Sequence, residues 1–255
     1  MWDAFKIAFS MYSKIPMPKA EWSKNNMKYS LCFFPAVGVS VGLMVYFWSI
    51  ISNKLNIGTT LTAAIFVVIP IIITGGIHVD GFIDCNDAIN SYQPMERKLE
   101  ILKDSHIGAF ALITCITYFI IDFGVWSEVK GEMVILLAIG FVLSRALSGL
   151  SIVTFPLAKD SGLAATFSNS ADKFKVRITM IAYIVLCIVL MLYVNIILGI
   201  IVVSTAFLVF LYYRMTAIKK FGGITGDVAG YFLQLCELSM ALMLVSVDKI
   251  VQFIG

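Results

Sequence analysis

The sequence predicts an all-α protein, a polytopic integral membrane helical bundle with about seven transmembrane helices. Of its 255 residues 60% are hydrophobic, and the mean hydropathy is +0.92. Charged residues make up 14%, whereas ordinary soluble domains hold about 25%. Apolar runs of about 20 residues, long enough to cross a bilayer, recur along the chain. A soluble fold of this size could not bury so much apolar surface, so we expect a lipid bilayer around the protein.

The predicted spans follow one another closely. Seven apolar segments qualify: 31–51, 59–76, 108–126, 133–154, 178–193, 196–213 and 228–247. The apolar stretch 178–213 is too long for one span, so we divide it near Asn195 into a helical hairpin. Six or eight spans stay open as alternatives. We expect the whole chain, 1–255, to form a single integral membrane domain.

The positive charges divide unevenly between the two sides that these spans define. If the N-terminus is cytoplasmic, four cytoplasmic segments carry fifteen of the 19 Lys and Arg residues. They are an amphipathic N-terminal segment (1–30), an acidic motif region (77–107), a longer loop (155–177) and a glycine-rich loop (214–227). The opposite side carries three, namely Lys54, Lys130 and Lys249. Because cytoplasmic loops are enriched in Lys and Arg, we predict a multi-pass protein of the cytoplasmic membrane with its N-terminus inside.

Most of the polar, acidic and glycine-rich motifs also fall on the predicted cytoplasmic side. A transporter places its polar groups near the bilayer midplane on broken helices, whereas this chain gathers them at one surface. The placement favours an enzyme with a cytoplasm-facing active site over a cation or metal transporter. The net charge of +3 is mild, which argues against a nucleic-acid partner.

Three aspartates stand close together just after the second span. Asp80, Asp84 and Asp87 are spaced i, i+4 and i+7, which on a helix puts them on one stripe about 60° wide. Like charges this close repel near a low-dielectric boundary, and a bound divalent cation would relieve the repulsion. Carboxylate oxygens suit Mg²⁺ or Mn²⁺, which also bind substrate phosphate. The alternative is a solvated helix end whose acids favour the helix dipole.

A second acidic pair, Glu100 and Asp104, follows at i, i+4. Carboxylates on two neighbouring helices could hold two metals against a pyrophosphate, so Glu100 is a fourth candidate metal ligand. Asp104 is the candidate general base and Lys103 a candidate catalytic residue, with Arg97 and Ser105 as candidate phosphate-binding residues. The alternative for this segment is ordinary surface pairing, such as Glu100 with Arg97.

The glycine-rich loop and one intramembrane arginine are further candidates for phosphate binding. Glycines let backbone amides approach a phosphate, although a plain turn and a helix N-cap at Asp227 stay open. Arg145 lies inside the fourth span, where charge is costly and usually functional; it could bind phosphate, pair with an acid or snorkel to the interface. The candidates are Gly222, Gly223, Thr225, Gly226, Asp227 and Arg145.

Several separated motifs together resemble one family. "GGIHVDGFIDCNDA" (75–88) is followed by "RKLEILKDSHIGAFA" (97–111). "FPAVGVSVG" (34–42) precedes them, and "SRALSGL" (144–150), "DSGLAATFS" (160–168) and "GGITGDVAGYFLQLCEL" (222–238) follow. In this order, and over most of the chain, they resemble the cobalamin synthase family of adenosylcobinamide-GDP ribazoletransferases.

The resemblance implies a reaction and its surroundings. The 3′-hydroxyl of α-ribazole, or of its 5′-phosphate, would attack the corrinoid-side phosphorus of adenosylcobinamide-GDP. GMP would leave, and adenosylcobalamin or its 5′-phosphate would form. The resemblance also implies Mg²⁺ and the cytoplasmic membrane.

The family is in turn distantly similar to the CDP-alcohol phosphotransferases, whose signature is DxxDG…AR…GxxxDxxxD. Asp84 and Asp87 match its first acidic pair, and Glu100 and Asp104 match the second. Ala88 replaces the signature glycine and the Ala-Arg pair is missing, which disfavours the alternative of a phospholipid head-group phosphotransferase. A homodimer is expected only by analogy with these distant relatives.

Overall fold

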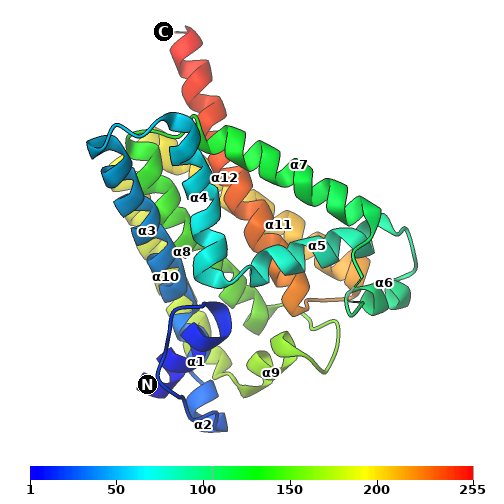
Figure 1. The fold of residues 1–255 in the computed structure, drawn as a ribbon. Helices are drawn as coiled ribbons and strands as arrows, with labels where there is room; N and C mark the ends of the chain where they lie inside the picture. Colours follow the sequence, from blue (N-terminus) through cyan, green and yellow to red (C-terminus); the bar gives the residue numbers. More distant parts are fainter. Residues whose placement is uncertain (105, 255) are drawn as a thin grey trace.

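The protein, here a computed structural model that describes residues 1–104 and 106–254, is built from helices (Figure 1). In chain order they are α1 (Trp2–Tyr12), α2 (Lys24–Met27), η1 (Ser30–Phe33), α3 (Phe34–Lys54), α4 (Thr59–Thr74), α5 (Ile77–Asn90), α6 (Met95–Ile101), α7 (Ala109–Trp126), α8 (Glu132–Thr154), α9 (Leu163–Ser170), α10 (Lys173–Val194), α11 (Ile196–Phe221) and α12 (Gly226–Ile254). The described residues form no strands, only an isolated bridge between Leu157 and Ile224. The predicted all-α class is confirmed.

Six helical segments are long and apolar enough to cross a membrane. They are Ser30–Lys54, which joins η1 to α3, then α7, α8, α10, α11 and Gly226–Phe253 of α12. The pair α4 and α5 is a seventh candidate, bent by 95°. Gly75 and Gly76 make the bend, with left-handed φ angles of 68° and 78° that favour glycine. About seven spans, as predicted, are confirmed.

The connection between α10 and α11 is a tight turn at Asn195, which confirms the predicted hairpin. The Asn195 side chain caps α11 by accepting a hydrogen bond from the Leu198 N–H at 3.0 Å. Gly199 packs against the preceding helix, since a Cβ there would lie 2.7 Å from the Met191 carbonyl oxygen. Only glycine allows the two helices to approach so closely.

Much of the sequence predicted as cytoplasmic is helical, and α10 and α11 extend beyond the predicted spans 178–193 and 196–213. Residues 77–107 contain α5 and α6, while α10 begins at Lys173 and α11 continues to Phe221. The N-terminus, α2 and α9 lie together at one end of the bundle, and the C-terminus lies at the other (Figure 1). We call the first the basic end, because segments 1–30, 77–107, 155–177 and 214–227 carry most of the Lys and Arg residues.

Helix α8 is the centre of the bundle and packs against α3, α10 and α12. Of its apolar window 78% is buried. Gly38 and Gly42 bring α3 into backbone contact with it: a Cβ on Gly38 would lie 2.8 Å from the carbonyl carbon of Phe141, and one on Gly42 would lie 3.0 Å from that of Ala138. Small residues four positions apart allow such close crossings in membranes.

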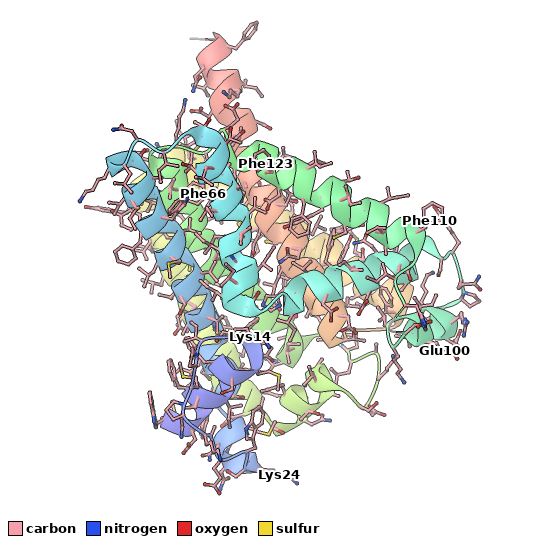
Figure 2. All side chains as sticks on the ribbon, viewed as in Figure 1. Lys14, Lys24, Phe66, Glu100, Phe110 and Phe123 are labelled. Atoms are coloured by element: carbon pink, nitrogen blue, oxygen red, sulfur yellow. The ribbon has the colours of Figure 1, made fainter. Side chains whose placement is uncertain are left out.

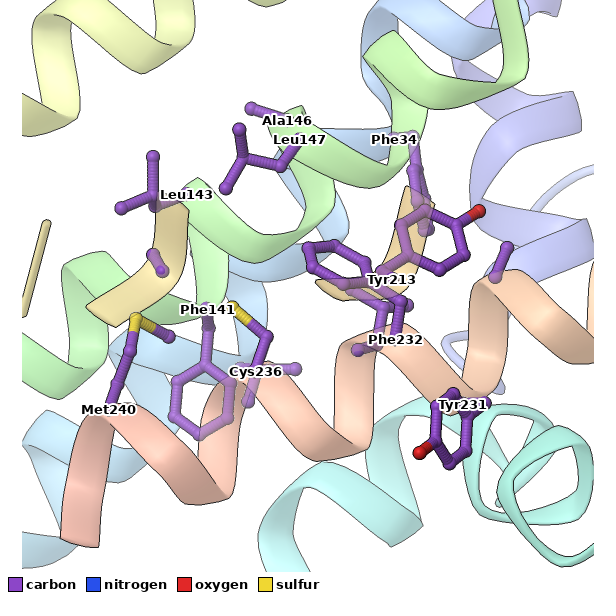
Figure 3. Close-up of a cluster of buried hydrophobic side chains, with 14 of the residues drawn as sticks. Phe34, Phe141, Leu143, Ala146, Leu147, Tyr213, Tyr231, Phe232, Cys236 and Met240 are labelled. Carbon is purple, nitrogen blue, oxygen red and sulfur yellow. The ribbon is translucent and has the colours of Figure 1, made fainter. Parts of the chain in front are cut away.

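Aromatic and sulfur-containing side chains fill the space on the other side of α8 (Figure 3). Phe141 of α8 lies beside Cys236 and Met240 of α12, and Tyr213 of α11 stacks on Phe232 with ring centroids 4.7 Å apart. This packing fixes α12 against α8 and α11, and α12 in turn carries residues of the site described below.

A buried ion pair joins α8 to α12. Arg145 Nη1 lies 2.7 Å from Glu237 Oε1, with the arginine side chain 0% and the glutamate side chain 10% exposed. The hydroxyl of Ser144 donates to the same oxygen at 2.8 Å. Arg145 therefore has an acid partner, one of its predicted alternatives. The candidate role in phosphate binding is not supported, because the guanidinium is enclosed between helices.

We expect Glu237→Gln to destabilise the protein by about 3–5 kcal/mol, because it leaves the Arg145 guanidinium buried without its counter-charge. The double variant Arg145→Met/Glu237→Leu should lose less stability than the single one, since both charges are removed. Unfolding of purified protein in detergent, followed by circular dichroism, measures both. Equal stability of Glu237→Gln and the wild type would contradict this account of the pair.

Candidate active site

Helix α5 carries the three predicted aspartates. Asp80, Asp84 and Asp87 all lie within Ile77–Asn90, which confirms that this segment is a helix and that their spacing is helical. Asp80 is exposed, whereas Asp84 and Asp87 are half-buried. The bend at Gly75–Gly76 starts α5 in a new direction, so the carboxylates follow the apolar α4 without continuing its axis.

Two glycines bring α5 into close contact with the first turns of α12. A Cβ on Gly81 would lie 2.8 Å from the backbone oxygen of Asp227 and 2.9 Å from its Cα. A Cβ on Gly230 would lie 3.2 Å from the backbone oxygen of His78. The crossing places Asp227, from a segment far along the chain, beside the acids of α5.

We call Asp80, Asp84, Asp87 and Asp227 the acidic cluster. Asp80, Asp87 and Asp227 all act electrostatically on Asp84, and Asp80 and Lys159 act on Asp227. No set of three or more His, Cys, Asp and Glu side chains in the described part of the chain is arranged as a ready-made metal site. Mg²⁺, however, usually takes only one or two carboxylates, with water and substrate phosphate completing its shell. The all-oxygen donors of the cluster fit that requirement.

Asp87 lies against the start of α7. A Cβ on Gly108 would contact Asp87 Oδ1 and lie 2.8 Å from its Cγ, so only glycine leaves room for the carboxylate. The positive end of the helix dipole of α7 favours a negative charge at this position. This contact joins the two sequence motifs 75–88 and 97–111.

A pocket of about 240 Å³, which we call the basic pocket, opens beside the acidic cluster. Lys103 and Lys159 line it together with Thr225, Gly226 and Asp227. Partial burial and then the charge of Lys103 lower the pKa of Lys159, while Asp227 acts in the opposite direction. An anion between the two ammonium groups would relieve their repulsion, which makes the pocket suitable for phosphate.

The position of Lys159 is held by a hydrogen bond from its Nζ to the backbone oxygen of Leu99, at 2.6 Å. Lys159 is not among the site residues that the sequence predicts. Its only signal was its place in the loop just before the "DSGLAATFS" motif. Lys103, in contrast, was a candidate and does line the pocket.

The glycine-rich loop forms the border of the basic pocket in a way that differs from the prediction. The N–H groups of Gly222 and Gly223 donate to the carbonyls of Ile218 and Ala217 in α11, at 3.1 and 3.0 Å. They therefore end a helix instead of binding a phosphate. Gly222 has a left-handed φ of 74°.

The rest of this loop is tied to the segment before α9. The Ile224 N–H donates to the Pro156 oxygen at 2.9 Å, and the Ala158 N–H donates to the Ile224 oxygen at 3.0 Å. Thr225 is the N-cap of α12, since its hydroxyl accepts from the Val228 N–H at 3.2 Å. Because Thr225 caps the helix, the carboxylate of Asp227 is not needed as a cap and is available to the acidic residues of α5 beside it.

A second pocket, of about 220 Å³, lies on the other side of Asp227. We call it the apolar pocket, because most of its lining is aliphatic or aromatic. Asp80, Asp227 and Gly226 also line it, and Asp227 and Gly226 are shared with the basic pocket. Asp227 thus borders both pockets, and Asp80 borders the apolar pocket.

The predicted second acidic pair does not join the acidic cluster. Arg97 Nη1 and Glu100 Oε2 lie 2.5 Å apart on α6, with side chains 63% and 64% exposed. This is the surface pairing that was the alternative interpretation, and Figure 2 places Glu100 at the edge of the fold.

Asp104 is engaged elsewhere as well. It accepts from the His106 N–H at 3.0 Å and lies 2.7 Å from His106 Nδ1. These hydrogen bonds hold the pKa of Asp104 below its ordinary value, which makes it a weaker base. The other candidate of this segment, Ser105, lies outside the described residues.

These features define a class of protein, a multi-pass helical membrane protein with an acidic cluster beside a lysine-lined pocket. Comparison with known sequences gives the particular family: a sequence model described as cobalamin-5-phosphate synthase matches residues 4–245. The chain belongs to this family.

Relatives of the chain carry the name adenosylcobinamide-GDP ribazoletransferase. The one from Lachnoclostridium phytofermentans is 48% identical over 245 residues, which are 96% of this chain and 94% of the relative. That of Clostridium perfringens strain SM101 is 33% identical, covering 95% and 97%, and that of Fusobacterium nucleatum is 30% identical, covering 92% and 94%. No solved structure matches. The chain is therefore a transferase of cobalamin synthesis.

The close contact between α5 and α12 predicts that substitutions of its two glycines lower activity to different extents. Gly81→Ala should lower activity about 100-fold or more, because its Cβ must push the Asp227 backbone away from the other acids and misplacement of about 1 Å is enough for such a loss. Gly230→Ala should cost less, since its nearest contact is 3.2 Å. Activity of both variants, measured beside their thermal stability, tests this order. Equal activity of Gly81→Ala and the wild type would contradict it.

Proposed function

We propose that the enzyme joins α-ribazole or α-ribazole 5′-phosphate to adenosylcobinamide-GDP, releasing GMP, with Mg²⁺ held at the acidic cluster. The observation that supports this most directly is the shared border of the two pockets at Asp227. A transfer between two substrates needs both of them next to the reacting phosphorus, and Asp227 borders both pockets.

The basic pocket supports a diphosphate-bearing donor. Lys103 and Lys159 supply two ammonium groups for phosphate oxygens. The acids alone would repel the donor, so metal at Asp84, Asp87 or Asp227 is part of the proposal. The chemistry that Mg²⁺ would supply when bound is neutralisation of negative charge on the diphosphate and on the leaving group.

The proposed reaction is a displacement at phosphorus. The 3′-hydroxyl oxygen of the acceptor forms a bond to the corrinoid-side phosphorus, and the bond from that phosphorus to the bridging oxygen breaks. The electron pair leaves with that oxygen on GMP. We assign the hydroxyl proton to Asp80, which is exposed and lines the apolar pocket. Asp104 is less suitable, because it is paired with His106.

The orientation in the membrane is also part of the proposal. The basic end would face the cytoplasm, as the distribution of Lys and Arg indicates. The charged nucleotide substrates would then reach the acidic cluster directly from the cytoplasm. The placement of the acids at one end of the bundle disfavours the transporter alternative, whose sites lie near the midplane.

Asp84→Asn and Asp87→Asn should each lower turnover by about 100-fold or more, because each removes a charge that would hold metal against the diphosphate. The assay gives purified enzyme adenosylcobinamide-GDP, acceptor and Mg²⁺, and follows GMP and the corrinoid product together. Asp248→Asn, at the opposite end of the bundle, is the matched control and should keep wild-type activity.

Two outcomes of this assay would overturn parts of the proposal. Absence of GMP with both acceptors for the wild type would refute the reaction. Full activity after removal of divalent cations by a chelator would refute the metal.

Lys159→Ala should raise the KM for adenosylcobinamide-GDP by about tenfold to 100-fold and change kcat less, since one charge-assisted hydrogen bond contributes about 1.5–3 kcal/mol. The control is Lys24→Ala, an exposed lysine on α2 that Figure 2 shows at the tip of the basic end. Steady-state kinetics with varied donor at saturating acceptor separates KM from kcat. An unchanged KM in Lys159→Ala would show that Lys159 does not bind the donor.

A further inference from the structure

The apolar pocket has a lining that phosphate chemistry does not require. Side chains from five parts of the fold enclose it: Tyr12 of α1, Leu31 and Phe34 near the start of the first span, Ile152 of α8, Ala164 of α9 and Leu233 of α12. Most of these are almost fully buried; for example, Leu31 and Leu233 are each 1% exposed. Such a lining binds an apolar group and excludes water.

The size of the pocket limits its occupant. An apolar cavity of about 150 Å³ is enough to bind benzene, so about 220 Å³ accommodates a fused two-ring aromatic group. The tetrapyrrole-like ring of a corrinoid, with its amide side chains, is far larger. A guanine base, with its many polar edge atoms, would lose hydrogen bonds to water in this lining.

The aromatic walls and the few polar groups suit a flat heterocycle. The rings of Tyr12 and Phe34 lie with centroids 4.4 Å apart, and Phe167 lies 5.6 Å behind Tyr12. His78 lines the pocket, is 4% exposed, and its Nε2 has no hydrogen-bond partner among the described residues. A ring nitrogen in the pocket could provide the missing partner.

We propose that the apolar pocket is the subsite for the aromatic base of the acceptor nucleoside, and that Ile152 sets the size of base it accepts. The inference rests on the proposed function, which supplies an acceptor whose base, a dimethylbenzimidazole, has two fused rings. With the base in this pocket, the ribose projects toward Asp80 and Asp227 at its border. The donor diphosphate reaches Asp227 from the basic pocket, which this carboxylate also lines.

Ile152→Ala should widen the pocket and shift the preference of the enzyme toward larger bases. The assay uses α-ribosides of benzimidazole, dimethylbenzimidazole and the three-ring naphthimidazole, and compares kcat/KM. We expect the ratio for naphthimidazole over dimethylbenzimidazole to rise about tenfold or more, the range that one or two methylene-sized changes give in an apolar pocket. The matched control is Val153→Ala, the next residue on α8, which is equally buried but does not line the pocket.

A second variant provides an independent test in case Ile152→Ala does not fold. Ala229→Leu, on the α12 wall, fills the pocket and should shift the ratio of benzimidazole over dimethylbenzimidazole upward, again about tenfold. Unchanged base preference in folded samples of either variant, or an equal shift in Val153→Ala, would overturn the subsite. An inactive wild type with all three acceptors would instead overturn the proposed function, so the two failures are distinguishable.

Discussion

The site depends on one close crossing of two helices. Gly81 of α5 faces the backbone of Asp227, and Gly230 of α12 faces the backbone of His78, with no side chain between the two helices at these points. Without this close approach the three acids of α5 would have no carboxylate from α12 beside them, and Asp227 would lie apart from the acidic cluster. The bend at Gly75–Gly76 is the other requirement, because α5 can cross α12 only after it has left the axis of α4. Glycine thus assembles the acidic cluster without contributing a functional group to it.

Local patterns in the sequence were sufficient for the spans and for one half of the site. Hydropathy located the membrane helices because each must satisfy its own backbone hydrogen bonds in lipid. Helical periodicity predicted that Asp80, Asp84 and Asp87 share one face of a helix, which also depends only on residues close together in the sequence. The acidic residue that lies opposite these three aspartates could not be predicted from such local patterns. The i, i+4 spacing of Glu100 and Asp104 predicts them as the partners, and Asp227 is predicted only as a phosphate-binding residue. A tertiary crossing that no spacing rule encodes brings Asp227 beside these aspartates.

Arg145 and the glycine-rich loop are cases in which one sequence pattern is compatible with two different structural roles. An arginine inside a span indicates either a ligand site or an internal partner, and Glu237, 92 residues away, supplies the partner. Gly222 and Gly223 could have exposed backbone amides to a phosphate, yet those amides satisfy the last carbonyls of α11. In both cases the role of the residue is decided by its burial and by hydrogen-bonding groups elsewhere in the fold that need a partner. A single sequence does not show either of these.

The two pockets also bear on a problem that faces any enzyme that cuts a diphosphate, namely that water competes with the intended nucleophile. Asp80 lines the apolar pocket, so the carboxylate that we propose as the base borders a cavity whose lining is mostly apolar. An acceptor base in that cavity would displace the remaining water and bring its ribose hydroxyl to the carboxylate in the same event. Selectivity for the nucleoside over water would then arise from the apolar lining, and activation of the hydroxyl from the acid at its border.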